Sequence, residues 1–104
     1  MITCVHASSV EVALEPLAPD CVTSGSPESG LADLPAPPGM EVGIWEHSVG
    51  TSTDVEADEV FVVISGRAVI TAEGMASIEV GPGDVVTLAE GTATTWTVLE
   101  TLRK

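Results

Sequence analysis

The chain has 104 residues, of which 16 are acidic and three are basic, so its formal net charge is −13. Hydrophobic residues make up 44% and the mean hydropathy is +0.37, a composition that indicates one folded domain and not a disordered segment. The acidic balance argues against nucleic acid and membrane surfaces as partners, because both attract proteins through basic patches.

The start of the chain and its apolar runs give no targeting signal. Residues 1–6 lack the basic-then-apolar order of a signal peptide, and the longest apolar run, residues 60–64, is too short to span a bilayer. We therefore expect a cytoplasmic protein. Cys4 and Cys21 match no metal-binding spacing, so we expect two reduced, partly buried thiols.

Residues 1–15 form an N-terminal arm that we expect to contain a strand. Val10, Val12 and Leu14 alternate with other residues at the period of a half-buried strand, and Pro16 ends the pattern. Residues 16–39 hold six of the seven prolines and three glycines, so we expect no regular element there. This long surface loop either covers a site or a partner, or is a tolerated insertion.

From Met40 onward, short β-rich runs alternate with glycine turns. The runs and turns lie at residues 40–47, 50, 60–64, 68–71, 73–74, 78–80, 81–84, 85–88 and 94–98. Strands this short predict an all-β antiparallel barrel or sandwich of about eight strands, formed by a single domain with residues 40–104 as its core. Such a barrel either fills its interior with side chains or holds one small ligand.

Several of these residues resemble the motifs of the cupin family. Glu59, six residues and Gly66 resemble the end of the first cupin motif, in which two histidines precede the glutamate. Gly83, five residues, Ala89-Glu90-Gly91 and Thr94 resemble the second motif, with alanine in place of proline and threonine in place of histidine. The resemblance implies a cupin-type barrel, also called a jelly roll or double-stranded β-helix.

A finer pattern over residues 40–104 resembles the small cupins of the ureidoglycine aminohydrolase type. Its pieces are Gly43-Ile44-Trp45-Glu46, Gly50, Asp58-Glu59, Ser65-Gly66-Arg67, Glu73-Gly74, Pro82-Gly83-Asp84, Gly91, Trp96 and Arg103-Lys104. This resemblance implies hydrolysis, isomerisation or lyase chemistry on a small nitrogenous or carbonyl compound. Residues 1–39 carry no part of it.

The usual metal ligands of cupins are not matched in this chain. The first-motif histidine positions fall at 52 and 54, or at 53 and 55, and none of these is a histidine. Because Thr94 replaces the second-motif histidine, only Glu59 remains, and a lone carboxylate holds a transition metal weakly. We therefore predict no metal and no other cofactor; an unconventional site that includes Asp54 and His47 is the alternative.

Candidate site residues follow from the alternation of inward and outward positions along barrel strands. If Glu59 points inward, Phe61 and Val63 do so too, and on the last strand Thr94, Trp96 and Val98 face in together. We expect these residues to line a mostly apolar cavity that carries one carboxylate, one hydroxyl and one indole. That composition is typical of small-molecule pockets.

Glu59 and His47 are the candidate catalytic residues. A carboxyl group desolvated among aromatic and aliphatic side chains is suited to carry protons to and from a substrate; the alternative is a structural Glu59 bonded to backbone amides or Arg67. Glu46 and His47 lie on opposite faces of their strand, so at most one enters the pocket, and His47 is the candidate general base. Trp45 and Trp96 either bind a planar or cationic ligand or fill the core.

Three functions remain open on this basis. The first is an enzyme that performs metal-free acid–base chemistry on a small metabolite with Glu59. The second is a non-catalytic barrel that binds a small ligand, and the third is a structural barrel whose own side chains fill the interior. An apolar N-terminal strand with an open edge predicts a homodimer under all three.

Overall fold

The computed structural model describes all 104 residues and contains ten β-strands and one short 3-10 helix. The strands are β1 (Glu15–Pro16), β2 (Val22–Ser24), β3 (Glu28–Leu34), β4 (Val42–His47), β5 (Gly50–Val55), β6 (Glu59–Val62), β7 (Ser65–Ala72), β8 (Ile78–Val80), β9 (Val85–Leu88) and β10 (Ala93–Arg103). The helix, η1, covers Pro19–Cys21, and the chain has no helix with the length and apolar character to cross a membrane. This architecture confirms the predicted all-β fold class.

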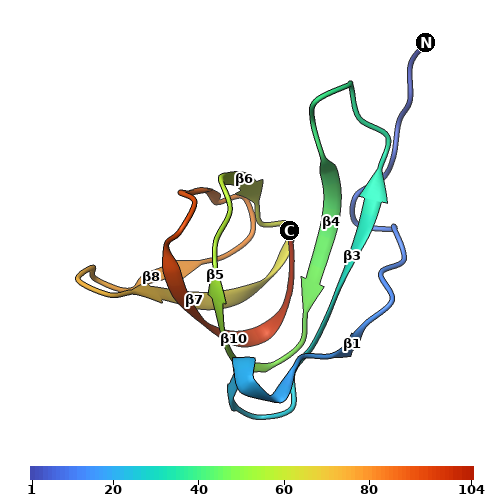
Figure 1. Cartoon of the computed structure of the whole chain (residues 1–104). Helices are drawn as coiled ribbons and strands as arrows, with labels where there is room; N and C mark the ends of the chain where they lie inside the picture. The colour runs from blue at the N-terminus through green and yellow to red at the C-terminus, as the bar shows by residue number, and fades with distance from the viewer.

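Strand β10 is the centre of an eight-stranded antiparallel sheet. Its residues 93–98 pair with β5 on one side, and residues 94–98 pair with β7 on the other. Its end pairs with β4 through Leu102 and Arg103. The register against β7 shifts between Val98 and Arg103, as at a β-bulge, which bends a strand. Strands β5, β7, β8 and β10 curl around one side of the molecule, while the β3–β4 hairpin stands apart from them (Figure 1).

The core lies inside this curl, closed by a separate two-stranded sheet of β6 and β9. Its buried members alternate with exposed or half-buried neighbours along β7 and β10. This alternation is expected when every second side chain of a strand points inward. Fully burying one large apolar side chain contributes about 1.5–3 kcal/mol. The core residues are Phe61, Val63, Ala68, Ile70, Val80, Leu88, Trp96, Val98 and Leu102.

Gly83, in a predicted turn, and Gly66, in the first motif, require glycine for different reasons. In the turn at 81–84, Gly83 has φ +89° and the Asp84 carboxylate accepts a hydrogen bond from the Gly81 N–H at 2.8 Å. At the start of β7, Gly66 has φ +87°, and a Cβ there would lie 2.0 Å from the carbonyl oxygen of Thr101. Only glycine lets β7 begin this close to the bend of β10.

The strand predicted in the N-terminal arm is much shorter in the structure than the alternation indicated. Only Glu15 and Pro16 pair with another strand. The residues before them lie against β3 at Gly30, where Ala13 and Val12 are in contact, and Arg103 of β10 donates hydrogen bonds to the carbonyls of Ala7 and Val10. The arm therefore uses its backbone carbonyls to bind an arginine instead of extending a sheet, and the homodimer inferred from its open edge stays a prediction.

The prediction that residues 16–39 contain no regular element is also wrong. Strands β2 and β3 form there, and β3 pairs with β4 without interruption from Ser29–His47 to Leu34–Val42. Pro27 and Pro35 flank β3 but do not interrupt it, so no ladder donor is missing within the strand. Pairing with β4 thus overrides the proline-rich local composition, as is common for strands, whose stability depends on context.

Candidate functional site

The inward positions predicted from the alternation converge on the barrel interior. Phe61, Val63, Thr94, Trp96 and Val98 are all buried, and Trp45 packs against their cluster from β4. The Glu59 side chain is 39% exposed, so its carboxylate is not desolvated in the way that the pattern suggested. The interior therefore has the expected aromatic and aliphatic wall, with a carboxylate that reaches solvent.

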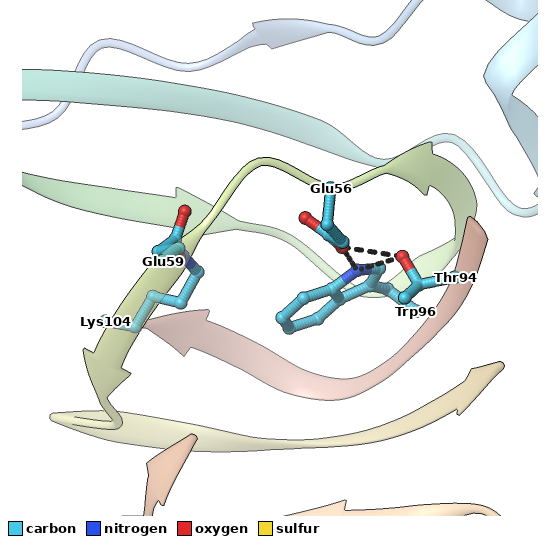
Figure 2. A network of polar contacts seen from close by, with 5 residues as sticks. All are labelled: Glu56, Glu59, Thr94, Trp96 and Lys104. Atoms are coloured by element: carbon cyan, nitrogen blue, oxygen red, sulfur yellow. Dashed lines mark hydrogen bonds and ion pairs between the residues drawn. The ribbon is translucent and has the colours of Figure 1, made fainter. Parts of the chain in front are cut away.

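Lys104 lies between Glu59 and three aromatic rings. We call this end of the interior, where the Glu59 side chain reaches solvent, the barrel mouth. Its Nζ forms an ion pair with Glu59 and lies 4.3 Å, 4.8 Å and 5.9 Å from the ring centroids of Phe61, Trp45 and Trp96. Figure 2 shows the Glu59–Lys104 pair beside the indole of Trp96. We call Trp45, Phe61, Trp96 and Glu59 the aromatic cage; each ring attracts a cation at this range by about 0.5–2 kcal/mol.

The backbone fixes where Lys104 enters the cage. Its N–H donates to the carbonyl of Trp45 at 2.9 Å, and its own carbonyl accepts from the Trp45 N–H at 2.8 Å. The preceding residue, Arg103, points to the opposite face and pairs with Glu46 at 3.3 Å. Adjacent residues of a strand face opposite sides of the sheet. Arg103 therefore binds the N-terminal arm on the outside, while Lys104 fills the barrel mouth on the inside. Arg103 and Lys104 therefore each form an ion pair with a glutamate of another strand, Glu46 of β4 and Glu59 of β6.

Glu56 is a second interior carboxylate that the sequence reasoning missed. The residue is only 8% exposed, and its Oε2 accepts hydrogen bonds from the Thr94 hydroxyl at 2.6 Å and from the Trp96 indole at 3.0 Å (Figure 2). Thr94 is therefore committed to Glu56 and does not face an open cavity alone. The alternation along β5 does not reveal it, because Asp54 at the preceding inward count is exposed and Glu56 follows the end of the strand at Val55.

His47 is completely buried and both of its ring nitrogens have partners. Nδ1 lies 2.6 Å from the Ser48 carbonyl oxygen, and Nε2 lies 2.8 Å from the Ser52 hydroxyl. Because a carbonyl only accepts, Nδ1 carries the proton and Nε2 accepts from Ser52. Burial is the main cause that lowers the pKa of His47 below its ordinary value of 6.5, against an opposing contribution from the Ser48 carbonyl. The imidazole is therefore neutral at pH 7.

The side chains at the expected ligand positions do not assemble a cupin metal site. Ser52 is bonded to His47, Thr94 to Glu56, and Glu59 to Lys104. Asp54, the unconventional candidate, is exposed and accepts from the neighbouring Val55 N–H at 2.8 Å. No group of three or more histidine, cysteine, aspartate or glutamate side chains is placed to hold an ion. This donor set does not fit the transition metal that cupins bind.

A surface hollow lies on the outer face of β5, β7 and β10, away from the cage. It is bordered by Cys21 and by Thr53, Thr95 and Thr71, which are direct cross-strand neighbours. Thr94 and Asp54, the unconventional metal candidate, border this hollow. Trp45, Glu59, Phe61, Trp96 and Lys104 do not, so the cage and the outer hollow are different features of the barrel.

The curled antiparallel sheets and the aromatic interior define a small cupin barrel. A family profile described as the EutQ-like cupin domain matches residues 38–104, the segment that holds every residue of the aromatic cage. The chain belongs to this EutQ-like cupin family. A search among curated proteins finds no match.

Solved structures support the same fold. The EutQ protein of Clostridium difficile is similar with a TM-score of 0.75 and 22% identity, over 98% of this chain and 82% of that one. A putative ethanolamine utilization protein Q of Salmonella typhimurium is similar with a TM-score of 0.64 and 21% identity, over 73% and 64%. A DUF861 family protein of Thermotoga maritima is 30% identical with a TM-score of 0.55, over 58% of this chain and 69% of that one.

Proposed function

We propose that the chain binds a small molecule at the barrel mouth, without a metal. The observation that carries the proposal is the Glu59–Lys104 pair set against three aromatic rings. The exposed part of Glu59 gives solvent a route to the pair, while the Lys104 side chain is only 10% exposed. An apolar wall with a few convergent polar groups is typical of small-molecule sites.

Acid–base catalysis at the same mouth is the second candidate, and the ion pair favours it. An ammonium and a carboxylate in contact supply a proton donor and a proton acceptor to one bound substrate. The resemblance to ureidoglycine aminohydrolase-type cupins supplies a reaction class, namely hydrolysis, isomerisation or lyase chemistry on a small nitrogenous or carbonyl compound. Since the metal ligands of that activity are not matched here, Glu59 and Lys104 would carry the protons. His47 is sealed and supports this role less well.

The test uses the tryptophans as reporters. Trp45 and Trp96 are the two tryptophans of the chain and both belong to the cage, so a ligand in the mouth changes their fluorescence. We expect a saturable change with at least one class in a panel of small amines, carboxylates and carbonyl compounds. If no class gives a saturable change, the binding proposal fails and a structural barrel remains.

A matched pair of variants separates binding from catalysis. In a binder, Glu59→Gln changes affinity alone, whereas in an enzyme it abolishes turnover of the bound compound while affinity is kept. Glu73→Gln, the same change at an exposed turn residue, serves as the control and leaves both properties at the wild-type level.

A further inference from the structure

We propose that the aromatic cage is a site for organic ammonium ions, that Lys104 occupies it in the free protein, and that a small alkylammonium ion displaces Lys104. The inference rests on the proposed function at the barrel mouth and names the class of ligand. It concerns binding only and requires no covalent step.

The cage has the components by which proteins bind organic cations. The Trp45 and Trp96 ring centroids are 5.5 Å apart and those of Phe61 and Trp96 are 5.7 Å apart, so the three rings form a continuous wall. Glu59 adds one carboxylate at the position of the ammonium group. A lysine side chain beyond its Cα is an n-butylammonium ion in chemical terms, so the cage already accommodates a primary alkylammonium of four carbons.

The charge of the chain favours a cation over an anion at this mouth. Each of the three basic side chains already has a glutamate partner: Arg67 with Glu79, Arg103 with Glu46, and Lys104 with Glu59. The remaining acids have no basic side chain to neutralise them, and their summed field attracts cations and repels anions. An anion would also have to displace Glu59 from Lys104 against this field.

The occupant is held in a way that permits exchange. Backbone hydrogen bonds to Trp45 anchor the Cα end of Lys104, but the ammonium end is held only by Glu59 and the rings. Ordering a lysine side chain costs conformational entropy, which is regained when the side chain is released. A free ligand competes with a tethered group whose effective concentration is in the millimolar range, so we expect weak binding in wild type.

The decisive experiment observes Lys104 directly, because it is the only lysine of the chain. Protein labelled with [ε-13C]lysine gives one Cε–Hε signal, which ring currents shift upfield while the side chain lies in the cage. We expect n-butylammonium chloride to move this signal saturably towards the shift of free lysine. Sodium chloride and n-butanol, which match its ionic strength and its length, should leave the signal in place. A signal that stays upfield in n-butylammonium overturns the inference.

The variant Lys104→Ala gives a second readout in an emptied cage. Followed by tryptophan fluorescence, it should bind n-butylammonium at least about tenfold more tightly than wild type, because no tethered group competes. If the folded variant binds n-butanol as tightly as n-butylammonium, the small-molecule site stands but its selectivity for ammonium ions is refuted. If it binds neither compound and the wild-type protein binds no member of the broader panel, the proposed function fails as well.

Discussion

Glu56 and Glu59 are three residues apart and face one barrel interior, yet they have different surroundings. Glu56 is sealed and accepts from two neutral donors, the Thr94 hydroxyl and the Trp96 indole. Glu59 lies at the mouth, is partly exposed and faces a single cation on a long side chain. The contrast shows that depth in the barrel separates a carboxylate that completes the buried core from one that is partly exposed and pairs with a cation.

The largest expected effect is a loss of stability on removal of the buried Glu56 carboxylate. Glu56→Ala removes the acceptor that Thr94 and Trp96 share. The Trp96 indole keeps the Thr94 hydroxyl oxygen as an acceptor at 3.1 Å, but the Thr94 hydroxyl is left without one, and a buried donor without a partner costs about 1–3 kcal/mol, so we expect a loss of that size in the free energy of unfolding. Glu59→Ala removes a partly exposed ion pair and should cost less than about 1 kcal/mol. Urea unfolding of both variants measures the difference, and equal losses would contradict it.

An intermediate effect concerns pH and the second sealed polar group, His47. Because burial lowers its pKa in the folded state, the unfolded chain binds a proton first as the pH falls below 6.5. The stability contributed by neutral His47 is therefore complete above pH 6.5 and is lost as the pH falls towards the folded pKa, with a slope of at most about 1.4 kcal/mol per pH unit.

Urea midpoints of wild type and His47→Gln between pH 7.5 and 5.5 test this slope. We expect the variant to be less stable at pH 7.5 and to lose less stability on acidification. His6→Gln, at the exposed histidine of the N-terminal arm, is the control and should keep the wild-type pH profile. A variant at His47 with an unchanged slope would show that another group is responsible.

The smallest expected effect is that of removing one of the two donors to Glu56, the Thr94 hydroxyl. Thr94→Val keeps the shape of the side chain and removes its hydroxyl, while the Trp96 indole still donates to the carboxylate. The hydroxyl also accepts from the Trp96 indole at 3.1 Å, but the indole keeps Glu56 as its acceptor, so no buried donor is left without a partner. We therefore expect a loss of about 1 kcal/mol, the usual net contribution of one hydrogen bond. Thr101→Val, at an exposed position of β10, should be unchanged in the same unfolding measurement.

The barrel could be predicted from sequence because its signals are local. Alternation placed Phe61, Val63, Trp96 and Val98 inward, and their burial confirms it. Strand β3 was not predictable in this way, because its stability comes from pairing with β4 and not from its own composition. The meeting of Lys104 with Trp45, Phe61 and Trp96 depends on contacts between three segments, β4, β6 and β10 with the residue that follows it, and no periodicity along one segment reports such contacts.

Gly66 explains why the chain still resembles cupins that hold metals. A side chain at this position would meet the Thr101 carbonyl, so the residue is set by the crossing of two strands and not by any ligand. The positions of the metal-binding histidines have no such restriction, and here Ser52 and Thr94 fill them with hydrogen bonds to neighbours. Part of the cupin motif is therefore required by backbone packing and not by catalysis or metal binding. Similarity at Gly66 identifies the barrel fold and does not identify a reaction.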